Sequence, residues 1–538
     1  MSKVFELGIC MAGAVSAGAY TAGVMDFLIE ALETWEQHRG QPDVPEHRVV
    51  IKAIGGASAG GMTGIITSSA LNNPITPVRK ANPNNLFEAH PDNKFYQAWV
   101  DQIQDDMFPL MLNNDDIVKG RIYSLLNSSF IDKIGEKTLQ VNKDEYLERQ
   151  YIDNRLKVFT TLTNLEGFKY NTVFRGIERK NEYHLSHHAD YATFQLNSSN
   201  KDYNKDGWMP LDFFKDLNTK VALDAAKATG AFPIGLRSRK ISREVKYVND
   251  LKWNHPLLEK FKLDGDENGI YHALIIDGGT INNEPFEKVS SMIKGIHADE
   301  EKFTGTTIMI DPFPSYSGAF DISKDGLSSV VGKSLGAMLG HLRSKPKVII
   351  NTLNPNDFSR FQITPVRYHN EERVEGAKAI ACGFLGGFGG FMHKEFRIHD
   401  FFLGRANCEH FLRRYFVVDP NTNNPIFKEG YQNVSSHKFV NKDGKRQIIP
   451  IFKPLDKTMY MPTFEHGGIW PKRDKKDITR FKKQLRKRAG KMIMNASHFN
   501  WYGRLLLGIG NRLILRGMLA NNITKTILKS MDQHELIK

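Results

Sequence analysis

The chain has 538 residues, of which 41% are hydrophobic and 25% are charged, and its formal net charge is +13 at pH 7. This composition is ample for a buried core, and the length predicts two or three structural units. The three cysteines, at positions 10, 382 and 408, are too few and too widely spaced for a disulfide framework or a zinc cluster. No run of about 18 uncharged apolar residues occurs, so the sequence predicts no transmembrane helix.

The first segment is expected to form a strand, a glycine-rich turn and a helix. Residues 7–12 are mostly apolar, residues 13–19 are small, and apolar side chains recur at helical spacing over residues 24–32. A glycine-rich turn at the N-terminus of a helix presents backbone N–H groups that can bind an anion. In an acyl-transfer enzyme this anion is the oxyanion of the tetrahedral intermediate.

The second segment is Gly56-Ala57-Ser58-Ala59-Gly60, which follows the apolar run of residues 49–54. The apolar run predicts a short buried strand, and the small residues from position 58 onward predict the start of a helix. Gly-x-Ser-x-Gly between a strand and a helix is typical of a nucleophile elbow, a turn so tight that only small side chains fit beside the serine. Small residues also cluster at ordinary strand-to-helix turns, so a purely structural turn stays the alternative for the pentapeptide alone.

The third segment is an apolar strand over residues 273–276 that ends in Asp277-Gly278-Gly279. A carboxylate at the carboxyl end of a strand in an open α/β sheet lies where such folds bind their ligands. An Asp before two glycines is also a common turn, so this motif has a structural alternative as well.

Together the three segments resemble the patatin-like phospholipase family. The resemblance rests on residues 13–20 for the glycine-rich oxyanion loop, residues 56–60 for the nucleophile elbow and residues 277–279 for the Asp-Gly-Gly motif, in the family's order along the chain. Residues 156–167 and 222–233 are similar to the family's central strand and its alanine-rich helix. The resemblance covers about residues 4–311. It departs from the family at one point, because the usual Arg or Lys after the loop glycines is missing here.

The resemblance implies an α/β fold with a parallel-rich central sheet between helices, followed by a mainly helical C-terminal region. It implies a serine acyl-ester hydrolase that releases fatty acids from lipids, with glycerophospholipids as the expected substrates and no cofactor or metal. Asp277 would accept the proton of Ser58, and an acyl-enzyme would form. Loop N–H groups would stabilise the oxyanion by roughly 3–4 kcal/mol per donor. The expected site residues are Ser58 and Asp277 (catalytic), Gly13, Ala14, Val15 and Ser16 (oxyanion hole), and Gly56, Gly60, Gly278 and Gly279 (motif glycines).

Two other functions stay open from the sequence. One is a catalytically silent protein that binds lipid or membrane on the same fold, which the missing basic residue of the loop would favour. The other is an α/β-hydrolase esterase with a Ser-His-Asp triad, for which His399 and Asp400 are the candidates. Adjacent residues on one segment are poorly placed to act as proton relay and orienting group, which argues against the triad.

Three regions are expected along the chain. A catalytic domain spans residues 1–315, with an insertion at about residues 71–150 that lies near the site and would cover it. An extension that is helical and rich in Gly and Phe spans residues 316–470, and a basic amphipathic helical tail spans residues 471–538.

The tail carries 17 Lys and Arg against four Asp and Glu, so its net charge equals the +13 of the whole chain. Residues 472–491 predict a basic amphipathic helix, and residues 499–507 are aromatic and apolar, a composition typical of membrane-surface elements. We therefore expect a lipid substrate, an anionic membrane surface and no nucleic acid as partners. The expected location is the cytoplasm, with peripheral binding to the inner face of the membrane. The alternative is a helical subdomain that packs on the catalytic domain and has a merely solvated basic face.

Overall fold

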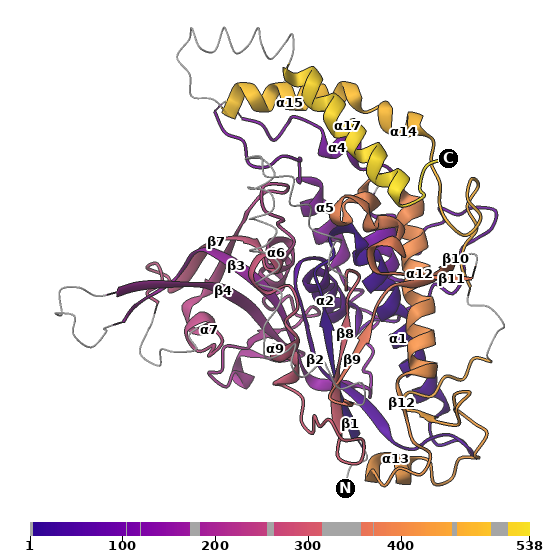
Figure 1. The fold of residues 1–538 in the computed structure, drawn as a ribbon. Coiled ribbons are helices and arrows are strands. Elements are labelled where there is room, and N and C mark those ends of the chain that lie inside the picture. Colours follow the sequence, from indigo (N-terminus) through magenta and orange to yellow (C-terminus); the bar gives the residue numbers. More distant parts are fainter. Residues whose placement is uncertain are drawn as a thin grey trace.

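The structure is a computed structural model that describes residues 4–103, 105–118, 120–172, 183–254, 263–314, 357–369, 371–454, 460–496 and 515–538. Its centre is a nine-stranded sheet (Figure 1). The strands of this sheet are β1 (Val4–Met11), β2 (Arg48–Gly56), β3 (Ile152–Thr172), β4 (Tyr183–Leu196), β5 (Met209–Leu211), β6 (Arg239–Glu244), β7 (Ile270–Asp277), β8 (Gly305–Ile310) and β9 (Arg360–Ile363).

The sheet has the order β5-β4-β3-β2-β1-β8-β9, and β7 pairs with both β3 and β6. The neighbours β3, β2, β1, β8 and β9 are all parallel, whereas β4, β6 and β7 join by antiparallel pairing. Parallel strands need crossover connections, and here helices provide several of them. The predicted α/β fold with a parallel-rich sheet is confirmed.

Helices cover both faces of the sheet. The helices of the first 315 residues are α1 (Gly18–His38), α2 (Ser58–Ala70), α3 (Lys94–Tyr96), α4 (Phe108–Met111), α5 (Phe130–Thr138), α6 (Thr219–Thr229), α7 (Val245–Asn249), α8 (Gly279–Asn282) and α9 (Phe286–Ser290). Alternate side chains of β1 point to opposite faces. Leu7 and Ile9 belong to the large core shared with α1 and α2, whereas Cys10 belongs to a smaller core with Phe159 of β3 and Val289 of α9.

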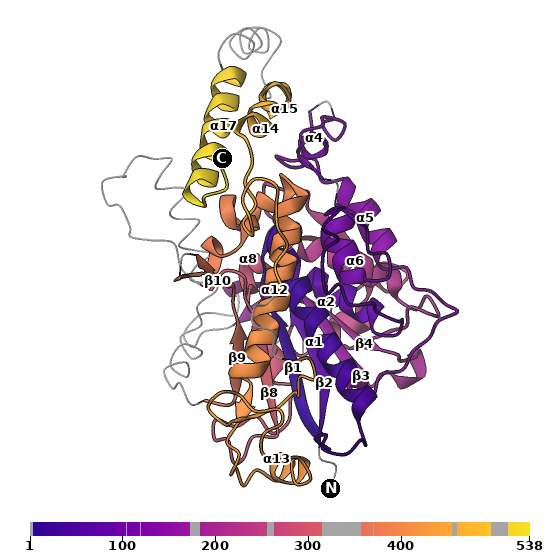
Figure 2. The ribbon, with the colours of Figure 1, turned by 90° about the vertical axis from the view of Figure 1, so that its right-hand side faces the viewer.

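Helix α1 is a core helix that packs side by side with α12 (Lys394–Arg414), as Figure 2 shows. A Cβ added to Gly23 of α1 would lie 1.9 Å from the backbone oxygen of Phe401, so the two helix backbones touch. The segment Val15–His38 is long and apolar enough to cross a membrane by length and composition, although the sequence predicts no transmembrane helix. In the most apolar 18-residue stretch of this segment, 89% is buried inside the protein. Packing within the protein therefore covers its apolar side chains.

The C-terminal region adds helices and short strands. It contains β10 (Val366–His369) paired with β11 (Glu372–Glu375), α12, β12 (Val417–Val418) paired with β13 (Arg446–Gln447), α13 (Pro425–Gly430), α14 (Lys475–Thr479), α15 (Lys482–Ala496) and α17 (Arg516–Gln533). Strand β9 even joins the central sheet, so residues 316–470 are less purely helical than expected. Helices α15 and α17 form an arm at the top of Figure 1. The aromatic block at residues 499–507 lies outside the described residues.

Candidate active site

Ser58 lies in the turn between β2 and α2. Its φ is +50°, in the left-handed region, and its side chain is buried. A Cβ added to Gly56 would lie 2.5 Å from the carbonyl carbon of Gly60, and one added to Gly60 would lie 2.3 Å from the backbone oxygen of Met11. Both motif glycines are therefore required by close backbone approach. The turn has the geometry of a nucleophile elbow.

Asp277 is the last residue of β7 and faces Ser58. The Ser58 hydroxyl donates to Oδ2 of Asp277 at 2.7 Å, and the backbone N–H of Gly279 donates to Oδ1 at 2.7 Å. Burial raises the pKa of Asp277 from 3.8 to about 7, and the two hydrogen bonds oppose this rise. A carboxyl group with a pKa near neutral pH is able to exchange a proton at that pH.

Two threonines position the pair. The Ser58 backbone N–H donates to Oγ1 of Thr229 at 2.9 Å, at the end of α6, and the Thr163 hydroxyl donates to the backbone oxygen of Asp277 at 2.9 Å. Gly278 lies directly on β3, since a Cβ there would come within 2.0 Å of the backbone oxygen of Thr161. The turn after β7 is thereby held against the central strand.

The glycine-rich loop lies beside the serine. A Cβ added to Gly13 would be 3.0 Å from Cβ of Ser58 and 2.3 Å from Oδ1 of Asn283. The Gly13 N–H donates to the backbone oxygen of Asn283 at 3.3 Å, so this amide is already engaged. The amides of Ala14, Val15 and Ser16 have no acceptor among the described residues. These three are the remaining candidate donors to an oxyanion.

The side chain of Ser16 joins this loop to the Gly/Phe-rich segment of the C-terminal region. Its hydroxyl donates to the backbone oxygen of Gly387 and accepts from the N–H of Gly390 at 2.9 Å. Residues 381–387 form a 3-10 segment that is kinked at residues 384–386, and residues 389–391 form a second one. The side chain of Phe391 reaches the pocket described next. The extension therefore contributes directly to the surroundings of Ser58.

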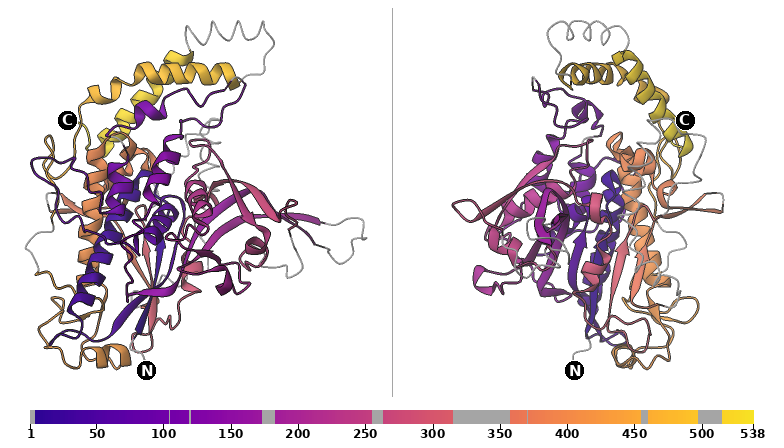
Figure 3. Two further views of the ribbon diagram at one scale, coloured as in Figure 1. Left: turned by 180° about the vertical axis from the view of Figure 1, so that it is seen from behind. Right: turned by 60° about the vertical axis from the view of Figure 1, so that its left-hand side comes forward.

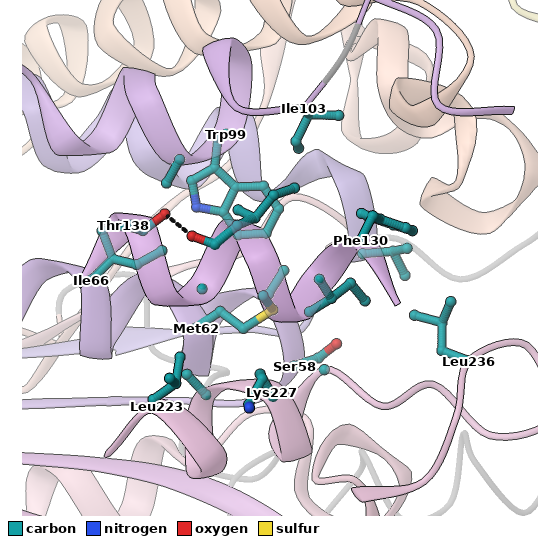
Figure 4. A pocket seen from close by; sticks show the side chains of 18 of the residues that line it. Ser58, Met62, Ile66, Trp99, Ile103, Phe130, Thr138, Leu223, Lys227 and Leu236 are labelled. Atoms are coloured by element: carbon teal, nitrogen blue, oxygen red, sulfur yellow. Dashed lines mark hydrogen bonds between the residues drawn. The ribbon is translucent and has the colours of Figure 1, made fainter. Parts of the chain in front are cut away.

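An apolar pocket of about 840 Å³, a volume that includes open solvent at its mouth, has Ser58 in its lining. Ser58, Met62 and Ile66 of α2 follow one another along it, and the indole of Trp99 faces them (Figure 4). Nearly every other lining side chain is apolar, and about half of the lining residues, among them Trp99 and Phe130, come from the insertion at residues 71–150. Residues 71–150 thus form one side of the pocket. The pocket suits an acyl chain.

The histidine of the alternative triad is engaged elsewhere. Nδ1 of His399 lies 2.8 Å from Oδ1 of Asp400, and this carboxylate also accepts from the backbone N–H groups of Ala381 and Cys382. These contacts fasten the start of the Gly/Phe-rich segment to α12. Among the described residues, no histidine lines the pocket or hydrogen-bonds to Ser58 or Asp277.

The described ranges contain no cluster of three or more His, Cys, Asp or Glu side chains that could hold a metal ion. The three cysteines are buried and free. Burial raises the pKa of the Cys10, Cys382 and Cys408 thiols, which keeps them in the unreactive protonated form.

A serine turn between a strand and a helix on a parallel-rich sheet is the arrangement of α/β serine hydrolases. The sequence profile of the family described as patatin-like phospholipase matches residues 9–289. Uncharacterized protein y4iI of Sinorhizobium fredii (strain NBRC 101917 / NGR234) is similar to this chain, with 31% identity over 507 residues that cover 83% of the chain and 70% of the relative. The chain belongs to the patatin-like phospholipase family.

Several functional neighbours were not singled out from the sequence. Thr163 and Thr229 lie in the two segments matched to the family's central strand and alanine-rich helix, so their segments were found but not their roles. Trp99 comes from the insertion. Phe391 comes from the Gly/Phe-rich segment, whose alternating glycines and aromatics are consistent in the sequence with the lining of a lipid groove, with a lid hinge or with close packing of helices. No sequence signal ties these distant segments to Ser58, because their contact depends on the folded arrangement.

Proposed function

We propose that this protein is a lipid acyl hydrolase that acts through a Ser58–Asp277 dyad. The observation that carries the proposal is the 2.7 Å hydrogen bond to Asp277 from the hydroxyl of Ser58, which lines an apolar pocket. Family membership supports lipid hydrolysis as the class of reaction. The position of the pocket beside the nucleophile supports an ester with a long acyl chain.

In this mechanism Asp277 accepts the proton of Ser58 as the hydroxyl oxygen attacks the ester carbonyl. The amides of Ala14, Val15 and Ser16 are the proposed donors to the oxyanion. Collapse of the tetrahedral intermediate expels the alcohol, which takes a proton from Asp277. Water then attacks the acyl-enzyme and gives its proton to Asp277. Collapse of this second tetrahedral intermediate releases the fatty acid, and the departing Ser58 oxygen takes the proton back from Asp277. Glycerophospholipids are the proposed substrates.

Replacing either member of the dyad tests this proposal. Ser58→Ala and Asp277→Asn should each lower kcat/KM for a soluble short-chain ester by roughly 10⁴-fold or more, and the double variant should lose little further. Ser68→Ala is a matched control on the same helix, because its buried hydroxyl donates only to the backbone oxygen of Ile65. An Asp277→Asn enzyme that kept most of its rate would exclude the dyad. A wild-type protein no faster than Ser58→Ala would favour the silent lipid-binding protein.

We also propose that the tail binds an anionic membrane surface, peripherally at the inner face of the cytoplasmic membrane. Helix α15 supports this because its exposed side chains include a row of cations, here called the cationic face. Each such cation near an anionic leaflet contributes about 1 kcal/mol. The cationic face consists of Lys482, Lys483, Arg486, Lys487 and Lys491.

A further inference from the structure

Exposed apolar side chains gather where the pocket opens. Phe232 lines the pocket and is also 37% exposed, so it marks the mouth. Ile234 is 67% exposed and Leu125 is 50% exposed, and the Leu125 N–H donates to the backbone oxygen of Ile234 at 2.8 Å. Tyr123, 38% exposed, lies two residues before Leu125. We call Tyr123, Leu125, Phe232 and Ile234 the apolar rim.

The backbone at Ile234 is strained. Its φ is +66°, a left-handed conformation that β-branched residues rarely adopt. Hydrogen bonds from Gly235 to the Pro233 oxygen at 2.7 Å and from Leu236 to the Phe232 oxygen at 2.9 Å hold the turn. A strained backbone that displays a large apolar side chain to water is unfavourable twice over for the isolated protein. Such outliers gather at functional sites, which indicates that a partner covers Ile234.

Helix α15, which carries the cationic face, contacts the apolar rim. Arg488 of α15 is buried and donates to the backbone oxygen of Leu125 at 2.6 Å. It also binds both carboxylate oxygens of Asp116, at 2.8 and 2.9 Å. Figure 3 shows α15 extending above the segment that follows α4. The helix that carries the exposed cations is therefore attached to the apolar rim at Leu125.

We propose that the apolar rim and the cationic face form one surface that docks on an anionic lipid bilayer, so that the pocket mouth opens into the membrane. The cations meet lipid phosphates while the rim enters the interfacial region, a combination typical of peripheral lipid-binding surfaces. An acyl chain can then pass over Phe232 into the pocket without crossing water. This proposal rests on the proposed function for its substrate, but the surface itself can be tested by binding alone.

The test compares rim variants with a control variant on vesicles of phosphatidylglycerol and phosphatidylcholine. The variants are Leu125→Asp with Ile234→Asp, and Ile234→Gly alone, which removes the side chain and relieves the backbone strain. Tyr415→Asp is the control, because Tyr415 is 58% exposed, directly follows α12 and belongs neither to the apolar rim nor to the cationic face. The readouts are vesicle sedimentation at low and high salt, hydrolysis of vesicle phospholipid, turnover of a soluble short-chain ester, and melting temperature.

The double Asp variant should bind vesicles at least tenfold more weakly and hydrolyse vesicle lipid at least tenfold more slowly, while its soluble-ester turnover stays within twofold. The loss should be largest at high salt, where the cationic face is screened and the rim carries the binding. Ile234→Gly should bind several-fold more weakly without a lower melting temperature. If both variants bound vesicles as tightly as the wild type, the proposal would be wrong. This would hold even if the same surface bound another protein. If the double Asp variant unfolds, vesicle binding by Ile234→Gly alone tests the proposal. A wild-type protein without any esterase activity would contradict the proposed function, and the vesicle-binding test would still be valid.

Discussion

At the scale of single residues, the proposed mechanism depends on the protonation of Asp277. Only the ionised carboxylate can accept the proton of Ser58, and burial raises its pKa from 3.8 to about 7. We therefore expect kcat/KM for a soluble ester to rise from pH 5, to reach half its plateau near pH 7, and to stay high at pH 8. A pH–rate profile of the free enzyme checks this. A profile that is flat from pH 5 to 8 would show that another group acts as the base.

The same buried carboxyl links activity to stability. Because its pKa is higher in the folded than in the unfolded chain, Asp277 stabilises the fold below about pH 4, and this contribution is lost as pH rises through about 7. The rise from 3.8 to about 7 corresponds to roughly 4 kcal/mol. Asp277→Asn should therefore melt at a higher temperature than wild type at pH 8, with a smaller difference at pH 5. An equal difference at both pH values would contradict the raised pKa.

At the scale of elements, helix α15 divides its cations between two roles. Arg488 pairs with Asp116 and packs on the insertion, whereas Lys482, Lys483, Arg486 and Lys487 are exposed. Replacing these four with Gln should weaken binding to anionic vesicles and reduce its salt dependence, with little change in melting temperature. Arg488→Gln should instead lower stability by about 3–5 kcal/mol, because it leaves Asp116 unpaired. Thermal melts and vesicle sedimentation distinguish the structural role of Arg488 from the membrane-binding role of the exposed cations. A loss of stability in the four-residue variant would instead favour a tail that packs on the catalytic domain.

The elements show which parts of the site could be read from the sequence. The elbow at Ser58 and the turn after Asp277 could be predicted, because each is formed by a few consecutive residues. Close backbone contacts there require glycine, so a short sequence motif identifies each turn. The pocket is not local. Trp99 reaches α2 from the insertion, and Ser16 binds Gly387 across 371 positions of sequence, so these contacts arise only when distant segments pack together. Arg488 is buried, whereas the neighbouring cations of α15 are exposed. Composition alone cannot tell a buried arginine from an exposed one.

At the scale of the whole molecule, α12 of the C-terminal region packs into the same hydrophobic core as β1 and α1. Helix α12 is almost entirely buried, and many of its apolar side chains share one hydrophobic core with β1 and α1. Its Arg405 forms buried ion pairs with Asp26 and Glu30 of α1. Through Ser16, the segment before α12 also contacts the glycine-rich loop. Catalysis and folding of the two regions should therefore be coupled.

Arg405→Leu tests this coupling in the full chain. Removing one partner of a buried ion pair leaves uncompensated charge on Asp26, so we expect a loss of about 3–5 kcal/mol in the free energy of unfolding. Arg79→Leu is the matched control, because Arg79 also pairs with Glu30, at 2.5 Å, but is 69% exposed and should matter by less than about 1 kcal/mol. If the regions share one core, esterase activity and helical circular dichroism should disappear in a single transition at a lower temperature. Activity that survives a first unfolding step would instead show that the C-terminal region folds as a separate unit.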